Sequence, residues 1–329
     1  MPKIGIMSFA HMHAYSYGAC LNALPEAEFV AVWDDKPRRG RAAARQFGAT
    51  FVSKLEKFLD LDLDGVIICS ENVKHREMTT LAAQAGKWVL CEKPLATNVA
   101  DAHAMIKACE KAKVGLGTAF PCRFAAPLRV ARDRIVSGEF GAVYAAACTN
   151  NGSNPGGWFA EDMLSGGGAT MDHTVHVVDV LRWITGKEFR KVYCEAGNVL
   201  HRDTLETDDV GLLQLEMEGG AQVSHVASWS RPKSFPTWGD VTIEFICEKG
   251  VLNVDAFNQR VDVYSDAAMK AEWVSWGGNP DLGLVRDFVR AIMEKRPPCA
   301  TGLDGLRATE VTVAAYESLK SGNVVKIRA

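Results

Sequence analysis

The chain has 329 residues, of which 47% are hydrophobic and 23% are charged, and its formal net charge at pH 7 is −3. A chain of this length is sufficient for about two domains, each with its own hydrophobic core. The small negative charge provides neither a basic surface for nucleic acid nor a polybasic arm for a membrane. The composition therefore excludes those two classes of partner and favours a protein that binds small molecules.

The cysteines and the N-terminus indicate the compartment. Nine cysteines are scattered along the chain without a Cys-x-x-Cys pair, which is typical of reduced thiols in the cytosol. The segment Met1–Ile6 leads directly into a strand-like pattern and lacks the layout of a signal peptide. No apolar run approaches the roughly 18 residues needed to cross a bilayer. We therefore expect a soluble, cytoplasmic protein.

The first 120 residues alternate between apolar strand-like segments and helix-forming segments. The expected strands are Lys3–Met7, Phe29–Trp33, Thr50–Val52, Gly65–Cys69, Trp88–Cys91 and Val114–Thr118. The expected helices include Pro37–Phe47, Val73–Ala85 and Val99–Ala112. This alternation predicts an α/β domain, residues 1–120, with a doubly wound parallel sheet covered by helices on both faces.

The pattern changes after residue 121, where strands separated by turn signals predominate. The expected strands are Ala142–Thr149, Lys191–Leu200, Asp209–Met217, Ala221–Ser230, Asp240–Glu248, Val251–Val254, Arg260–Tyr264 and Val324–Ile327. The expected helices are Pro127–Ser137, Ala169–Ile184, Asp281–Glu294 and Leu303–Ser321. A second, α+β domain, residues 121–329, is therefore predicted, with final helices that can pack back on the first domain.

The first strand-to-helix turn, Ser8–His13, is where a doubly wound sheet holds the phosphates of a dinucleotide. A glycine fingerprint would place Gly at Ser8, Ala10 and His13, and none is present. Small residues at two of these positions still allow a close backbone approach. The candidate cofactor residues of this turn are Ser8, Phe9, Ala10, His11 and Met12.

Asp34, at the end of the second strand, lies 26 residues after Ser8, where a carboxylate accepts hydrogen bonds from the adenosine ribose. Such a carboxylate repels a 2′-phosphate and favours NAD, but Arg38 and Arg39 leave NADP open. The alternative is that Asp34 belongs to a surface turn that caps the next helix.

The segment that follows the fourth expected strand, Gly65–Cys69, is expected near the nicotinamide half of the cofactor. Its candidate residues are Ser70, Glu71, Asn72 and His75. They could equally form an N-cap and a first helical turn.

A carboxylate and an imidazole follow the triple glycine Gly166–Gly168. If a helix starts there, Asp172 and His176 lie on one face, one turn apart. This arrangement suits a histidine that accepts a proton beside an acid that orients it. Taken singly, Asp172 could stabilise the helix N-terminus and His176 could be a core histidine.

The motif Cys91-Glu92-Lys93-Pro94, combined with the triple glycine, Asp172 and His176, resembles the Gfo/Idh/MocA family over essentially the whole chain. The resemblance implies an N-terminal Rossmann domain that binds NAD(P), with Glu92 and Lys93 beside the cofactor. It also implies a C-terminal α+β domain built on a large, mainly antiparallel sheet that often packs against another subunit. We therefore expect a homodimer or a homotetramer.

The resemblance further implies reversible oxidation of a secondary alcohol on a sugar, cyclitol or related polyol. The catalytic residues carried over by the motifs are Lys93, Asp172 and His176. Lys93 would donate a hydrogen bond to the reacting oxygen, and His176 would accept its proton. Further candidates for contact with the substrate are Arg123, Asn151, Trp158 and His173.

Two other functions remain open at this point. His11-Met12-His13 resembles the His-x-His of metal-dependent hydrolases, for which Asp172, His173 and His176 could complete a ligand set. A sensor that binds a sugar or a nucleotide without catalysis is the second alternative. The dehydrogenase is preferred, and it requires no metal.

Overall fold

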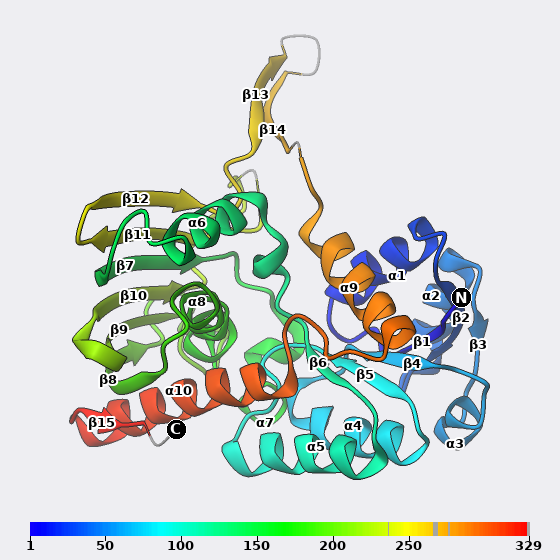
Figure 1. Cartoon of the computed structure of the whole chain (residues 1–329). Helices are drawn as coiled ribbons and strands as arrows, with labels where there is room; N and C mark the ends of the chain where they lie inside the picture. Colours follow the sequence, from blue (N-terminus) through cyan, green and yellow to red (C-terminus); the bar gives the residue numbers. More distant parts are fainter. Residues whose placement is uncertain (236, 266–268, 276, 328–329) are drawn as a thin grey trace. The chain divides into compact units, whose positions relative to one another are not determined.

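The computed structural model describes residues 1–235, 237–265, 269–275 and 277–327. The chain divides into two compact units. Unit 1 contains residues 1–121, 163–166 and 280–309, and unit 2 contains residues 122–162, 167–279 and 310–329. The helix α9 therefore belongs to unit 1 although it follows most of unit 2 in the sequence (Figure 1).

Unit 1 is built on a six-stranded sheet in the order β3-β2-β1-β4-β5-β6, and every neighbouring pair is parallel. The strands are β1 (Lys3–Met7), β2 (Glu28–Trp33), β3 (Thr50–Phe51), β4 (Gly65–Ile68), β5 (Trp88–Cys91) and β6 (Leu116–Thr118). This is the strand order of the Rossmann dinucleotide-binding fold, in which the direction of winding reverses between β1 and β4. The predicted fold class of the first domain is confirmed.

Helices cover the sheet of unit 1. They are α1 (His13–Ala23), α2 (Pro37–Phe47), α3 (Leu55–Leu59), α4 (His75–Gln84), α5 (Val99–Ala112) and α9 (Pro280–Glu294). Local signals explain where two of them begin. Pro37 occupies the first turn of α2, and the Asn98 side chain accepts a hydrogen bond of 2.9 Å from the Asp101 backbone N–H at the start of α5.

Unit 2 contains a seven-stranded mixed sheet in the order β12-β11-β7-β10-β9-β8-β15. Its only parallel pair among the described strands is β7 with β10. The strands are β7 (Val143–Asn151), β8 (Phe189–Gly197), β9 (Val210–Met217), β10 (Gln222–Ser228), β11 (Thr242–Cys247), β12 (Gly250–Asp255) and β15 (Val325–Lys326). The predicted, mainly antiparallel sheet is therefore confirmed.

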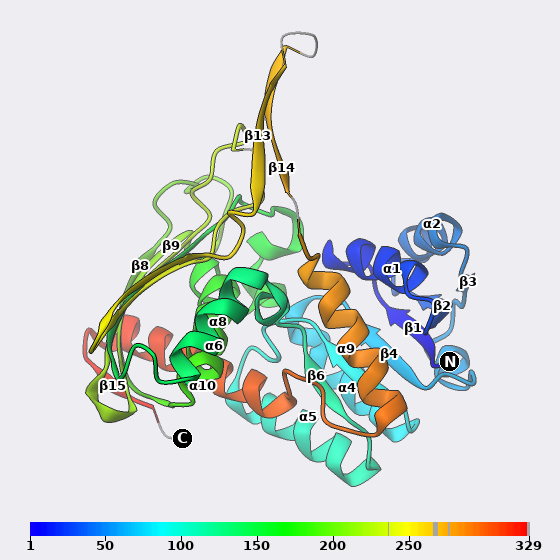
Figure 2. The same ribbon diagram turned by 45° about the horizontal axis from the view of Figure 1, so that its top comes forward.

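One face of this sheet is covered by helices. The long helix α8 (Ala169–Thr185) contacts β7, β9 and β10, and α6 (Ala126–Val136) packs against α8 (Figure 2). Fourteen of the 17 residues of α8 are buried, which is why its polar residues have to find partners inside the protein. The helix α10 (Gly302–Ser321) spans the boundary between the units along the chain.

Among the α-helices and strands that the structure describes, four were not predicted from the sequence: α1, α3, the short helix α7 (Asp162–Ser165) and the strand β14 (Lys270–Ser275). The strand β14 forms a separate hairpin with β13 (Arg260–Ser265). Elsewhere the predicted bounds differ from the observed ones by a few residues. Among the described helices, none combines the length and the apolar character needed to span a membrane.

Candidate cofactor and catalytic site

The turn between β1 and α1 uses most of its backbone donors within the protein. Five of its N–H groups donate to protein acceptors. Ser8 N donates to Trp33 O at 2.7 Å, Phe9 N to Asp34 Oδ2 at 2.8 Å, and Ala10 N to Ser8 Oγ at 3.1 Å. His11 N donates to Cys69 O at 2.9 Å, and His13 N to His11 Nδ1 at 3.1 Å. A glycine-rich turn presents such N–H groups to the pyrophosphate. This turn therefore has fewer backbone donors to offer.

Asp34 is buried and its carboxylate is occupied by protein donors. Oδ2 accepts from Phe9 N and Arg39 Nε, both at 2.8 Å, and Oδ1 accepts from Lys36 N at 2.7 Å and Arg39 Nη2 at 2.8 Å. Arg39 also donates to Ser8 Oγ at 3.2 Å, so it connects the first turn to the end of β2. It is Arg39 that contacts the carboxylate, whereas Arg38 is exposed on α2.

Beside it, Asp35 is held by two cations. Its carboxylate accepts from Arg39 Nη2 at 2.9 Å and from Lys74 Nζ at 2.6 Å. Burial opposes the charge of Asp35, but the hydrogen bond from Lys74 and the charges of Lys74 and Arg39 lower its pKa. The end of β2 is therefore a network of acidic and basic groups, and a ribose hydroxyl that binds Asp34 would have to share it with Arg39.

Glu92, at the end of β5, joins two histidines of the first turn. Its side chain is fully buried, with Oε1 3.0 Å from His13 Nδ1 and Oε2 3.9 Å from His11 Nε2. Burial would raise the pKa of Glu92, but the interactions with His11 and His13, including the hydrogen bond with His13, hold this pKa well below its ordinary value. Conversely, burial disfavours the imidazolium of His13, yet Glu92 raises the pKa of His13 above 6.5.

The ligand atoms of His11, His13 and Glu92 lie within 4.8 Å of one another, a spacing that could hold a metal ion. His11 Nδ1 accepts a hydrogen bond from the His13 backbone N–H, which places the proton of a neutral His11 on Nε2. A metal at Nε2 would need the opposite tautomer. The cluster is therefore organised by hydrogen bonds, and it does not have the tautomer that a metal site requires.

Lys93 follows Glu92 and is buried, and the Lys93–Pro94 peptide bond is cis. Its backbone N–H donates to Glu92 Oε2 at 3.0 Å. The neighbouring His75 forms a hydrogen bond between its Nδ1 and Pro94 O at 2.9 Å, and burial lowers its pKa. His75 is therefore a neutral side chain that supports the Lys93–Pro94 segment.

The other residues predicted near the nicotinamide lie at the start of α4. Glu71 pairs with Lys74 at 3.0 Å, and the Asn72 side chain donates to Ser165 O at 2.8 Å. Both side chains are buried, as is Ser70. They lie in the segment that connects the carboxyl end of β4 to α4.

The residues of unit 1 fit a dinucleotide. The strand order provides the crevice beyond β1 and β4, and the cationic side chains of His13, Arg39, Lys74 and Lys93 lie at the carboxyl ends of the strands or in the turns and helix starts that follow them. No acidic residue lies in the first turn of α1, whose N-terminus favours an anion. Without the glycine fingerprint, fewer backbone N–H groups of the first turn are available to a phosphate, but the strand order that forms the crevice is unchanged.

In unit 2, α8 carries Asp172, His173 and His176, and all three are buried. Asp172 Oδ2 accepts from Trp229 Nε1 at 3.2 Å and lies 3.3 Å from His173 Nε2. His176 Nδ1 lies 4.0 Å from Cys122 Sγ. The structure therefore gives Asp172 a neighbour, His173, that spacing along a helix did not predict.

His173 is held on both sides of its ring. Nδ1 is 2.8 Å from Asn150 O, and because a carbonyl only accepts, Nδ1 carries a hydrogen. Nε2 lies on the side of Asp172. The orientation of the His173 ring is therefore fixed by the protein.

The start of α8 depends on residues that the sequence analysis missed. Asp208 accepts from Gly168 N at 3.2 Å and from Thr170 N at 2.8 Å, and the Tyr316 hydroxyl donates to it at 2.6 Å. A Cβ on Gly168 would lie 1.8 Å from Asp208 O, so only glycine fits there. The acidic pair Asp208-Asp209 before β9 was the available signal, but its partner is 40 residues away.

The predicted substrate residues have protein partners within unit 2. Arg123 is buried and donates to both carboxylate oxygens of Asp179, at 2.8 and 2.6 Å. Trp158 stacks on Phe159 with ring centroids 3.8 Å apart. Asn151 accepts from Ser228 Oγ at 2.6 Å. Arg123 and Trp158 thus have structural contacts that account for their positions without a ligand.

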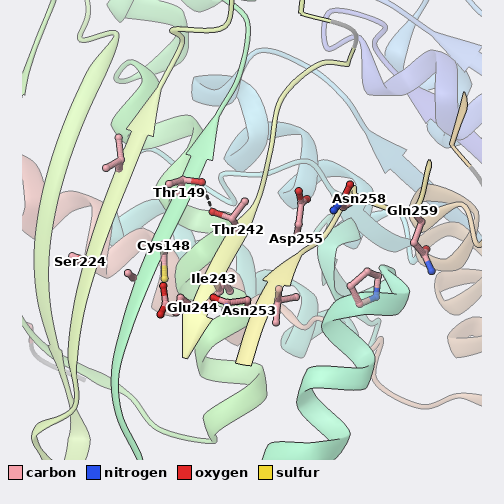
Figure 3. Close-up of a pocket in the computed structure, with 14 residues that line it drawn as sticks. Cys148, Thr149, Ser224, Thr242, Ile243, Glu244, Asn253, Asp255, Asn258 and Gln259 are labelled. Atoms are coloured by element: carbon pink, nitrogen blue, oxygen red, sulfur yellow. Dashed lines mark hydrogen bonds between the residues drawn. The ribbon is translucent and has the colours of Figure 1, made fainter. Parts of the chain in front are cut away.

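A hollow of about 720 Å³ lies on the sheet of unit 2. It is lined by residues of β7, β10, β11 and β12, by Pro127 of α6 and by the loop after β12. Thr149 and Thr242 meet there with their hydroxyl oxygens 2.6 Å apart (Figure 3). Its lining includes none of the residues predicted for catalysis. We therefore assign the hollow no part in the chemistry.

Two family descriptions match the chain. Residues 3–120 match the oxidoreductase family with an NAD-binding Rossmann fold, and residues 128–253 match the GFO/IDH/MocA C-terminal domain. These ranges cover the parallel sheet of unit 1 and most of the mixed sheet of unit 2.

Individual relatives agree with this assignment. Myo-inositol 2-dehydrogenase of Thermotoga maritima is 26% identical over 98% of this chain and 97% of its own length. 1,5-Anhydro-D-fructose reductase of Ensifer adhaerens is 40% identical over 48% of this chain and 49% of its own length. The structure of GenD2 from gentamicin A biosynthesis, in complex with NAD, shares the fold with a TM-score of 0.90 at 24% identity, covering 100% of this chain and 97% of that one. With both domains matched and the dinucleotide crevice in place, the chain belongs to the Gfo/Idh/MocA family of NAD-binding oxidoreductases.

Proposed function

We propose that this protein oxidises a secondary alcohol of a cyclitol, sugar or related polyol and transfers the hydride reversibly to NAD. The observation that carries this proposal is the combination of a dinucleotide-binding sheet in unit 1 with a buried group of ionisable side chains on α8. The names of the relatives, an inositol dehydrogenase and an anhydrofructose reductase, support a substrate that carries several hydroxyl groups.

Lys93, Asp172 and His176 are the proposed catalytic residues. Bound NAD supplies a nicotinamide ring that accepts or returns a hydride. Lys93 donates a hydrogen bond to the reacting oxygen and stabilises the negative charge that develops on it. His176 accepts the hydroxyl proton, at Nε2, because Nδ1 faces Cys122.

Asp172 provides the negative charge that stabilises the imidazolium of His176. Its hydrogen bond from Trp229 and its contact with His173 fix the orientation of the carboxylate. His173 is a positioning residue in this scheme, since Asn150 O holds its other ring nitrogen.

NAD is proposed as the preferred cofactor, because Asp34 and Asp35 place two carboxylates at the end of β2. Arg39 neutralises part of this charge. The 2′-phosphate of NADP is therefore repelled less strongly than it would be by carboxylates without the arginine.

We also propose a homodimer or homotetramer in which the sheet of unit 2 packs against another subunit. Ile246 and Val251 pair across β11 and β12 and are 45% and 51% exposed. Leu212 on β9 is 54% exposed. Apolar side chains on an open sheet face are typical of a surface that is covered in an assembly.

Initial rates of NAD reduction, measured with a panel of inositols, aldoses, anhydro sugars and linear polyols, test the proposed activity. We expect at least one cyclitol or sugar to be oxidised in an NAD-dependent manner. Absence of activity across the panel, despite measurable NAD binding, would argue against the substrate class.

The two alternatives are not favoured. The family and the named relatives are oxidoreductases, and the histidine cluster has the wrong tautomer for a metal. A non-enzymatic sensor would bind NAD without turning over any polyol, so the same panel separates it from the dehydrogenase.

A further inference from the structure

The first turn of unit 1 has few free backbone donors and contains a histidine where the glycine fingerprint has its third glycine. The N–H groups of Phe9, Ala10 and His11 are all donated to protein acceptors. A pyrophosphate bound at this turn therefore needs donors from side chains. His13 is the first residue of α1, at the place where the anion is expected.

The Glu92 carboxylate determines how the His13 ring is oriented. His13 Nδ1 lies 3.0 Å from Glu92 Oε1, and because the carboxylate only accepts, the hydrogen of this bond is on Nδ1. Glu92 is fully buried, whereas 29% of the His13 side chain is exposed. The ring is thus anchored on its buried side, and Nε2 is left as the nitrogen available to a ligand.

We propose that His13, oriented by Glu92, is a pyrophosphate-binding residue of the NAD site, whose protonated ring donates an Nε2–H hydrogen bond to a phosphate oxygen. The charged side chain replaces the backbone donors that the turn has lost. This inference rests on the proposed cofactor and identifies a residue that the glycine fingerprint would not provide.

Cofactor binding is then linked to the protonation of His13. The groups that face this ring are Glu92 and Lys93 at the end of β5, His11 in the turn, Tyr17 on α1 and Asp281 on α9. Burial disfavours the imidazolium, and Glu92 and Asp281 favour it while Lys93 opposes it, so that the pKa of His13 lies above its ordinary value. An anionic diphosphate bound beside the ring would stabilise the imidazolium further and raise the pKa of His13. At a pH above the pKa of the free protein, binding of the diphosphate should therefore be accompanied by proton uptake.

The test uses isothermal titration of the whole protein with ADP-ribose, which contains the diphosphate but lacks nicotinamide. Titrations run from pH 6 to pH 9 in two buffers of different ionisation enthalpy, so that proton uptake is measured directly. We expect the affinity of the wild type to fall about tenfold or more over this range, with proton uptake at the upper end. Adenosine, which has no phosphate, should show neither effect.

His13→Gln removes the charge and keeps a side-chain donor. We expect it to bind ADP-ribose about tenfold more weakly than the wild type at pH 6 and equally well at pH 9. His103→Gln is the matched control, since His103 is an exposed histidine on α5 of the same unit. It should retain the wild-type pH profile.

Nitrogen NMR measures the pKa of His13 directly in the wild-type protein, so this test does not depend on a variant. The pKa of His13 should rise when ADP-ribose binds and should stay constant with adenosine. Binding of ADP-ribose without pH dependence or proton uptake would overturn the role of His13 and leave the dehydrogenase proposal intact. A wild type that binds neither ADP-ribose nor NAD at any pH would overturn both.

Discussion

The charge and the hydrogen bonds of individual side chains in this protein depend on partners that can lie far away in the sequence. Glu92 remains charged inside the protein because His11 and His13, from the turn after β1, lie beside it and lower its pKa. Asp34 lies where the sequence predicted a ribose-binding carboxylate, but Arg39 and two backbone N–H groups already occupy its oxygens. The identity of a candidate residue is therefore predictable, whereas its availability to a ligand is not.

The proposed catalytic groups can be tested individually. Replacement of Lys93 or His176 by Ala should lower kcat for the best polyol by about 100-fold or more, because each variant loses a group that is proposed to act on the reacting oxygen. Circular dichroism should show an intact fold. The matched controls are Lys107→Ala and His103→Ala on the exposed side of α5, which should retain wild-type rates. Wild-type kcat in both active-site variants would refute the assignment.

The contacts of Asp34 allow a specific test of the proposed preference for NAD over NADP. Asp34→Ala removes the carboxylate and releases the Arg39 guanidinium, which can then bind a 2′-phosphate. We expect NAD to bind about tenfold more weakly and the preference for NAD over NADP to narrow. Dissociation constants for both cofactors, measured by fluorescence, provide the check. An unchanged ratio would show that Asp34 has only a structural role.

His225 should make the stability depend on pH. Burial lowers the pKa of this histidine on β10 to about 3, so the folded protein keeps the ring neutral in a range where the unfolded chain, with a pKa near 6.5, binds a proton. The contribution of His225 to the free energy of unfolding should therefore fall by about 1.4 kcal/mol per pH unit between pH 6.5 and 3. Urea denaturation at pH 7 and pH 5 measures it. His225→Phe should lose less stability over this interval than the wild type, and equal losses would contradict the burial of a neutral ring.

At the scale of elements, periodicity predicts a helix or strand well but says little about what its ends contact. The bounds of α2 and α5 were predicted as observed, because Pro37 and Asn98 are local signals at their starts. The helix α1 was not predicted, although Ala14, Tyr17 and Leu21 recur at helical spacing on its buried side. Its start at His13 lacks a capping side chain, which removes the usual marker.

The N-terminus of α8 provides the test at this scale. Gly168→Ala would place a Cβ 1.8 Å from Asp208 O, so either the loop before β9 or the first turn of α8 has to move. We expect a loss of about 2 kcal/mol or more in the free energy of unfolding and a loss of activity through displacement of Asp172. Gly278→Ala is the matched control, since no atom lies within 4 Å of that position. Similar stabilities for the two variants would show that the contact can relax.

At the scale of the whole molecule, the open face of the sheet in unit 2 predicts an assembly. Ile246→Lys places a charge among apolar side chains on this face and should shift the protein toward monomers in sedimentation velocity experiments. Val136→Lys on α6, where the side chain is 61% exposed, is the control and should leave the oligomeric state unchanged. A wild type that sediments as a monomer at micromolar concentration would contradict the proposed assembly.

By itself, the sequence determined most of the strands and helices in both domains, the family, and the motifs that contain Lys93, Asp172 and His176. These features depend on local propensity, on periodicity and on spacing within a few residues, all of which a sequence displays directly. Only the tertiary structure decided that His13 pairs with Glu92, that Arg39 covers Asp34, and that Asp208 holds the start of α8. Each of these contacts depends on a side-chain direction as well as on a fold, and buried polar groups accept whichever partner the packing brings within hydrogen-bonding distance.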